Sequence, residues 1–273
     1  MHTEMLPPRM IKIVLLILLV IYLLVIICAY FYQDKLLFFP QKFNPDYNFS
    51  ISSDDKELFL KTSDGETING IYATLPANKK VVLYFHGNGT SLNQWKTVAN
   101  AFLDKGANVL MIDYRGYGKS TGDFSEIGFY NDAQAGYDYL KSNGYDDSTI
   151  FIYGRSLGSG VAVEMAVRHQ VRGLILESPY TSVVDVAKKH HPYLVPQFLL
   201  KYEFNSLKKA SELKIPVLIF HGVKDEVIPV EQAEILNKAI KSKKQLLLFN
   251  DGDHANLSFF EDYDKALTAF LNQ

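Results

Sequence analysis

The chain has 273 residues, with 28 Lys and Arg against 30 Asp and Glu and a formal net charge of −2. This balance leaves no excess of cations to neutralise phosphates, so we expect no nucleic-acid partner. Hydrophobic residues make up 48% of the chain and aromatic residues 13%, which excludes a disordered or low-complexity protein. The single cysteine, Cys28, excludes an intrachain disulfide and a cysteine-based zinc site.

The N-terminal region contains an uncharged run of 19 residues, 13–31, that is rich in Val, Leu and Ile. A helix of this length spans about 28 Å, close to the roughly 30 Å hydrocarbon core of a bilayer. No small-x-small cleavage site follows the run, which favours a retained membrane anchor over a signal peptide. The bulky Ile27 before Cys28 disfavours processing as a lipoprotein.

The orientation of this anchor is weakly encoded. Arg9 and Lys12 before it are balanced by Lys35 and Lys42 after it. The terminal amine then favours a cytoplasmic N-terminus, which would place the rest of the protein on the extracytoplasmic side. The apolar residues 36–40 predict that the chain leaves the anchor along the membrane interface.

The remaining sequence predicts strands and helices in alternation. The turn signal at 63–66 lies between two runs, 58–62 and 67–74, that predict an antiparallel hairpin. Short apolar runs typical of parallel strands buried on both faces follow at 81–85, 107–112, 150–153, 173–176, 216–220 and 246–249. Segments with helical spacing separate them at 92–104, 128–142, 157–169, 230–240 and 259–271.

This pattern predicts an α/β fold with an eight-stranded, mostly parallel, doubly wound sheet, helices on both faces and one N-terminal transmembrane helix. The long connection 181–214 is a candidate lid. The predicted organisation is a tail over 1–12, a transmembrane anchor over 13–32, a juxtamembrane segment over 33–44 and one domain over 45–273.

Ser156 is the candidate nucleophile. It is the centre of Gly-Arg-Ser-Leu-Gly at 154–158, which follows a predicted strand and opens a predicted helix. A sharp turn between strand and helix is the setting in which Gly-x-Ser-x-Gly presents a reactive serine. The alternative is a plain strand-to-helix turn, which the combined context disfavours.

A serine nucleophile needs a base and an acid that orients the base. His254 follows the last predicted strand and completes the chain order Ser, Asp, His, whereas His86 and His221 precede loops expected to have other duties. For the acid we favour Asp225, in the loop after the strand 216–220, with Glu226 as the alternative.

The oxyanion formed by a nucleophilic attack needs backbone donors. We expect one from the N–H of Leu157 and the other from Asn88, in the His-Gly-Asn-Gly loop at 86–89. Because both donors belong to the main chain, the side chain of Asn88 is expected to matter little.

A second glycine-containing segment, Arg-Gly-Tyr-Gly-Lys-Ser at 115–120, partly matches a phosphate-binding loop. The full pattern requires a glycine at position 113, where Asp113 stands instead. We therefore expect this segment to shape a loop beside the site, and we expect neither a nucleotide, another cofactor nor a metal ion.

Together these motifs resemble the α/β-hydrolase superfamily, and more narrowly its membrane-anchored abhydrolase-domain serine hydrolases. The resemblance covers nearly the whole chain and is carried by residues 86–89, 113–120 and 154–158 and by the loops of Asp225 and His254.

The resemblance implies a triad of Ser156, Asp225 and His254, an oxyanion hole at Asn88 and Leu157, and no cofactor. It also implies a membrane-tethered, lipase- or lysophospholipase-like hydrolase of acyl esters or thioesters, with lipid-like or acylated substrates. The alternatives are a serine peptidase of the same fold and a catalytically inactive, membrane-bound binding or scaffold module. The sequence does not specify an oligomeric state.

Overall fold

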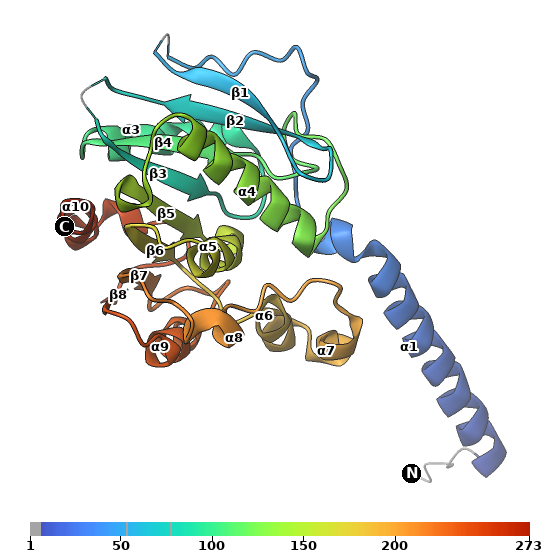
Figure 1. Cartoon of the computed structure of the whole chain (residues 1–273). Coiled ribbons are helices and arrows are strands. Elements are labelled where there is room, and N and C mark those ends of the chain that lie inside the picture. Colours follow the sequence, from blue (N-terminus) through green and yellow to red (C-terminus); the bar gives the residue numbers. More distant parts are fainter. Residues whose placement is uncertain (1–6, 53, 77) are drawn as a thin grey trace.

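The computed structural model describes residues 7–52, 54–76 and 78–273. At its centre lies an 8-stranded sheet with the order β1-β2-β4-β3-β5-β6-β7-β8 (Figure 1). The pairs β1–β2 and β2–β4 are antiparallel and all other neighbours are parallel, which confirms the predicted sheet. The strands are β1 (Lys56–Lys61), β2 (Thr67–Ala73), β3 (Lys80–Phe85), β4 (Ala107–Ile112), β5 (Ile150–Arg155), β6 (Gly173–Glu177), β7 (Val217–Gly222) and β8 (Lys244–Phe249).

Helices cover both faces of the sheet, so the central strands are buried on both sides, as their continuous apolar sequences predict (Figure 1). One apolar core lies under α4, α5 and α9, and the other lies under α3 and α10. These helices are α3 (Ala99–Leu103), α4 (Glu126–Ser142), α5 (Leu157–Arg168), α9 (Val230–Ala239) and α10 (Glu261–Leu271).

The predicted helix over 92–104 is wrong as a single element. The structure divides it into α2 (Leu92–Trp95), a 3₁₀ turn (Lys96–Val98) and α3. Thr97 and Val98 lie at the break, and β-branched residues like these have low helix propensity. The α-helix is therefore interrupted at these two residues and continues after them.

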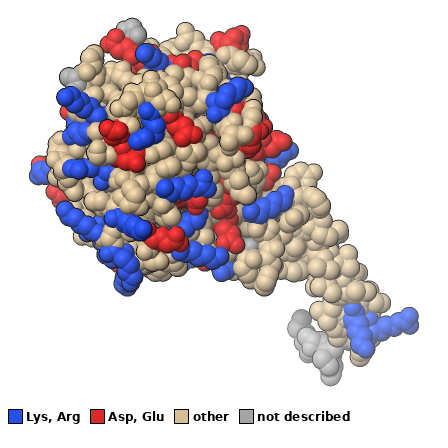
Figure 2. Space-filling model, viewed as in Figure 1, with Lys and Arg blue, Asp and Glu red and all other residues tan. Residues whose placement is uncertain are grey.

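The N-terminal helix α1 spans Pro8–Leu37 and projects from the domain (Figure 1). It is long and apolar enough to cross a membrane, and the rest of the described chain leaves its most apolar stretch uncovered. In Figure 2 its visible surface carries no charged side chain between its N-terminal end and the domain. The helix extends five residues into the predicted juxtamembrane segment, 33–44. Residues 1–6 of the predicted tail lie outside the described residues.

One residue of the segment predicted to follow the membrane interface, Phe38, lies inside the domain. This side chain is only 3% exposed and packs in the domain core against Phe124, Phe129 and Tyr202. The following residues pair with the domain, since Pro40 and Lys42 form parallel bridges with Thr90 and Gly118. The prediction is wrong for Phe38, because an aromatic residue after an apolar helix fits a protein core as well as a lipid interface.

The candidate lid, which we call the cap (181–214), contains short helices joined by irregular chain. It lies at the carboxyl end of β6 and reaches across to α1 (Figure 1). Its elements are α6 (Val183–His190), a 3₁₀ turn (Pro192–Leu194), α7 (Pro196–Leu199) and α8 (Ser206–Ala210).

Candidate active site

Ser156 lies in the tight turn between β5 and α5. Its backbone has φ 50° and ψ −118°, a conformation that L-residues rarely adopt. The flanking glycines make the turn possible, because a Cβ on Gly154 would collide with Ala162 and one on Gly158 would collide with the backbone of Phe85. The turn therefore places the serine at the start of α5, where the helix N-terminus favours negative charge.

His254 lies between Ser156 and Asp225. Its Nε2 is 3.0 Å from Ser156 Oγ and its Nδ1 is 2.8 Å from Asp225 Oδ2. With the ring proton on Nδ1 donated to Asp225, Nε2 is free to accept the proton of the serine hydroxyl. This arrangement is capable of activating a serine for attack on an acyl carbonyl.

The surroundings of Asp225 keep it ionised. Its other oxygen, Oδ1, accepts hydrogen bonds from the backbone N–H groups of Val227 and Ile228, at 2.9 and 2.8 Å. Burial raises the pKa of Asp225, but the hydrogen bond and charge of His254 and the N–H of Ile228 outweigh burial, so the pKa lies below its ordinary value. The buried His221 adds to this effect, with Nε2 3.5 Å from Asp225 Oδ2.

The alternative acids face elsewhere. Glu226 is exposed to solvent. The side chain of Asp253 accepts hydrogen bonds from the N–H groups of Ala255 and Asn256 and so shapes the loop that carries His254.

The sheet topology explains why these loops meet. β3 pairs with β4 on one side and with β5 on the other, so the chain changes direction across the sheet between β4 and β5. In an open α/β sheet a crevice forms at such a point, beyond the carboxyl ends of the strands. Asn88 follows β3 and Ser156 follows β5 on either side of that crevice.

Asn88 and Leu157 contribute two backbone N–H groups near Ser156. Within the described residues, neither group donates to a protein acceptor. The side chain of Asn88 has a part that the sequence analysis did not anticipate. Its Oδ1 accepts from the N–H of Gly89 and the hydroxyl of Tyr117, both at 2.9 Å, and its Nδ2 donates to the carbonyl of Leu37 at the end of α1. These contacts fix the loop that carries the backbone donor, a part that the expectation of a minor role for this side chain did not consider.

Arg155 is a residue of the site that the sequence analysis missed. Its Nη2 donates to the carbonyl of His254 at 2.9 Å, and its Nε lies 2.9 Å from Glu177 Oε1. Glu177 is buried and also accepts hydrogen bonds from the hydroxyls of Tyr153 and Tyr263. The buried carboxylate holds Arg155, and Arg155 holds the His254 loop. The position of a charged residue next to Ser156 could have indicated this role. Its partners, Glu177 and His254, lie in distant segments of the sequence.

His86 supports the loop of Asn88, as expected. It is fully buried, with Nε2 3.3 Å from Asp113 Oδ1, and its carbonyl accepts from the hydroxyl of Tyr114 at 2.8 Å. Asp113 also accepts from the N–H of Leu92. The buried pair therefore joins the ends of β3 and β4 next to the loop of Asn88.

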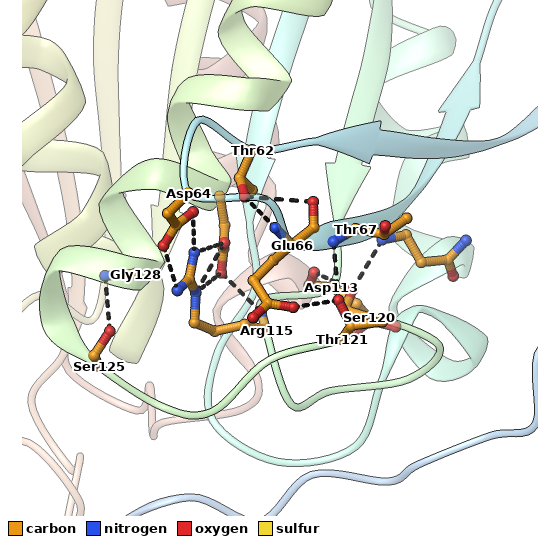
Figure 3. Close-up of polar contacts among 12 residues, drawn as sticks. Thr62, Asp64, Glu66, Thr67, Asp113, Arg115, Ser120, Thr121, Ser125 and Gly128 are labelled. Atoms are coloured by element: carbon orange, nitrogen blue, oxygen red, sulfur yellow. Dashed lines mark hydrogen bonds and ion pairs between the residues drawn. The ribbon is translucent and has the colours of Figure 1, made fainter.

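The segment 115–120 is committed to protein contacts rather than to a phosphate. Arg115 binds Asp64 in the β1–β2 turn and Asp132 on α4, each at 2.8 Å (Figure 3). Lys119 pairs with Glu57 at 2.8 Å, and Ser120 donates to the backbone carbonyl of Asp113. These contacts join the hairpin to the loop after β4.

A cavity of about 160 Å³ opens beside Ser156. We call it the site cavity. Its lining is mostly apolar and comes from the loop of Asn88, the start of α5, the cap and the end of α1. Lining residues include Leu37, Asn88, Ser156, Val186, Tyr202 and Phe204. Over the described residues, no group of three or more His, Cys, Asp or Glu side chains is arranged to hold a metal ion.

Comparison with known proteins finds relatives over most of the chain. Residues 76–203 match the family described as serine aminopeptidase, S33. An uncharacterized protein of Mycobacterium tuberculosis is 31% identical over 219 residues, which cover 79% of this chain and 78% of that protein. The protein bem46 of Schizosaccharomyces pombe is 30% identical over 243 residues, which cover 85% of this chain and 79% of the yeast protein.

Solved structures share the fold. An esterase of Pyrococcus furiosus, Pf2001, superimposes with a TM-score of 0.68 at 23% identity, covering 86% of this chain and 98% of the esterase. An α/β-hydrolase of Vibrio vulnificus gives a TM-score of 0.68 at 24% identity, covering 80% and 81% of the two chains. The protein belongs to the α/β-hydrolase superfamily. Within it, the chain is of the abhydrolase-domain kind.

Proposed function

We propose that this protein is a membrane-tethered serine hydrolase that cleaves acyl ester or thioester bonds of lipid-like or acylated substrates. Ser156, His254 and Asp225 act as its catalytic triad. The observation that carries the proposal is the position of His254, within hydrogen-bond distance of both Ser156 and Asp225. No metal ion or organic cofactor takes part in the proposed reaction.

In the first half-reaction, Ser156 Oγ attacks the acyl carbonyl while His254 Nε2 takes the hydroxyl proton. The N–H groups of Asn88 and Leu157 stabilise the oxyanion. Removing one such donor typically lowers kcat by about 10² to 10³-fold. His254 then gives its proton to the departing alcohol or thiol, which leaves an acyl group on Ser156.

In the second half-reaction, His254 takes a proton from water, and the resulting hydroxide attacks the acyl-serine. Collapse of this intermediate releases the fatty acid and returns the proton to Ser156. Asp225 stays ionised throughout and keeps the His254 ring in the orientation that both steps require.

The location and lining of the site support a lipid-like substrate. The site cavity is mostly apolar and includes Leu37, at the end of α1. We propose that α1 is a single-pass anchor with the hydrolase domain on the extracytoplasmic side, in agreement with the sequence expectation. The substrate would then be available in the same membrane as the enzyme.

An aminopeptidase is the second candidate, favoured by the description of the matching family. Such an enzyme needs a negative group to bind the free amine of its substrate. Among the described residues, those that line the site cavity include no Asp or Glu. An ester or thioester substrate is therefore the better proposal.

The first experiment labels membranes containing the full-length protein with a fluorophosphonate probe. We expect labelling of the native protein and of Ser142→Ala, an exposed control, and none of Ser156→Ala. The Ser156→Ala variant should also lose ester hydrolysis by about 10⁴-fold or more.

A folded native protein that is neither labelled nor active on any ester would contradict the proposal and favour the binding or scaffold alternative. Hydrolysis of peptide amides without a preference for esters would favour the peptidase. A panel of esters with acyl chains from acetyl to palmitoyl then tests the substrate class, and activity confined to acetyl esters would exclude a lipid.

A further inference from the structure

Two more cavities continue the site cavity toward α1. The middle groove, of about 440 Å³, lies between α1 and the cap and shares Leu37 and Val186 with the site cavity. The outer groove, of about 610 Å³, runs along α1 and shares Ala29, Leu36, Tyr193 and Leu194 with the middle groove. The three together form a series from Ser156 to Ile21.

Two polar side chains of the middle groove, Gln33 and His190, are bonded to protein partners. Gln33 donates to the carbonyl of Leu199 and accepts from the N–H of Lys201, at 3.3 and 2.8 Å. His190 Nε2 lies 2.8 Å from the carbonyl of Val227. The other side chains that line the grooves are chiefly aliphatic and aromatic. Such a lining suits the binding of a hydrocarbon chain.

The cap follows α1 deep into its apolar part. Tyr22 donates to the carbonyl of Tyr193 at 2.8 Å, and Asp34 accepts from the hydroxyl of Tyr202 at 2.6 Å. These α1 positions are 12 residues apart, or about 18 Å at the rise of an α-helix. One leaflet contributes only about 15 Å of hydrocarbon, half of a roughly 30 Å core. If α1 spans the membrane, the outer groove, which follows α1 from Ile21 to Leu36, opens at the depth of the lipid chains, and the middle groove connects it to the site cavity.

We propose that a single fatty acyl chain reaches Ser156 sideways from the bilayer, through the grooves between α1 and the cap. The substrate class is thus a membrane-resident ester or thioester whose one acyl chain lies along α1 while its carbonyl sits at Ser156. This inference rests on the proposed serine hydrolase function and specifies its substrate and route.

The position of His254 determines where the rest of the substrate lies. Its side chain is 23% exposed, whereas those of Asp225 and His221 are fully buried. His254 must give a proton to the leaving group, so the alcohol or thiol lies on the solvent side of Ser156. The acyl chain then occupies the other side, where the site cavity leads to the middle groove.

The test compares one long and one short ester, 4-nitrophenyl palmitate and 4-nitrophenyl acetate, on the full-length protein in liposomes. Ala187→Phe fills the middle groove from the cap, and Ala29→Phe fills it from α1. Val184→Phe and Ile27→Phe are the matched controls, because within the described chain they lie on the same helices but line neither groove.

We expect both groove variants to lower kcat/KM for palmitate by about 10-fold or more, as excluding about two methylene groups from an apolar site would do. Acetate turnover and fluorophosphonate labelling of Ser156 should stay within about twofold of native, because these small reagents do not need the groove. The two controls should behave like the native protein with both esters.

Other outcomes would contradict either the proposed route or the proposed function. Undiminished palmitate turnover in both groove variants would overturn the proposed route, and so would an equal loss for palmitate and acetate in protein that still labels. A native protein that hydrolyses neither ester and is not labelled would instead overturn the proposed function itself.

Discussion

At the scale of single residues, Asn88 has two separate tasks. Its backbone N–H is one of the two proposed oxyanion donors, and its side chain fixes the loop that presents this donor. The same side chain donates to the carbonyl of Leu37, so the loop is also fastened to the end of α1. An exact donor position is what makes an oxyanion hole effective, because preorganised groups need not reorient during the reaction.

We therefore expect Asn88→Ala to lower kcat by about 10-fold, less than the 10² to 10³-fold typical when a donor is removed outright, since the N–H is retained. Steady-state kinetics with a short ester measures the change. Tyr117→Phe, which removes only one hydrogen bond to Asn88, should cause a smaller loss. A native kcat in Asn88→Ala would mean that the backbone alone holds the loop.

Arg155 shows a similar indirect role. It touches neither proposed donor, but it connects the carbonyl of His254 to the buried Glu177. The base is thus held from two directions, by Asp225 at its ring and by Arg155 at its backbone.

At the scale of secondary-structure elements, α1 is part of the hydrolase as well as a candidate anchor. Its last turn lines the site cavity, and Gln33, only 2% exposed, joins it to the cap. Because a buried amide or carbonyl without a partner costs about 1 to 3 kcal/mol, this glutamine controls how firmly the cap rests on α1.

Gln33→Ala should loosen the cap. We expect hydrogen exchange at the Lys201 amide to become faster by about 10-fold or more, since it loses its acceptor and about 1 to 3 kcal/mol of protection. Exchange is measured by mass spectrometry on peptides from 191–203 of the protein in nanodiscs. Gln197→Ala, an exposed glutamine in the cap, serves as the control. Unchanged exchange in Gln33→Ala would show that the other contacts between α1 and the cap hold the cap without this glutamine.

At the scale of the whole molecule, the site affects stability as a function of pH. The pKa of Asp225 is lower in the folded protein than its ordinary value, because His254 and two backbone N–H groups favour the ionised form over the cost of burial. Ionised Asp225 therefore stabilises the fold above the unfolded pKa of about 3.9. This contribution is lost as the pH falls through the lower, folded pKa.

The stability of the native protein relative to Asp225→Asn should consequently be greatest near neutral pH and decline below about pH 4. Thermal unfolding midpoints of both proteins between pH 7 and pH 3 provide the measurement. Asp123→Asn changes an exposed carboxylate and should not reproduce the trend. A difference in midpoint that stays constant over this range would contradict the role given to Asp225.

Much of the molecule follows from local sequence. Short apolar runs predicted all six parallel-sheet strands because the central strands are buried on both faces and are mostly apolar, although β8, at the edge of the sheet, is only partly buried. The Gly-x-Ser-x-Gly turn was equally predictable, since α5 packs too closely on β5 for a Cβ at Gly154 and too closely on the end of β3 for one at Gly158. The order of Ser156, Asp225 and His254 along the chain predicted the three residues that the fold brings together.

The tertiary structure decided what depends on distant partners. Only the direction of each loop places Asp225 at His254 while its neighbour Glu226 faces solvent. Nothing local distinguishes Phe38 in a lipid interface from Phe38 in a protein core. The same holds for the contact of α1 with the cap, which joins residues 166 to 171 positions apart. The physical reason is that hydrophobic burial has no direction: the sequence determines which residues avoid water, and packing determines against what.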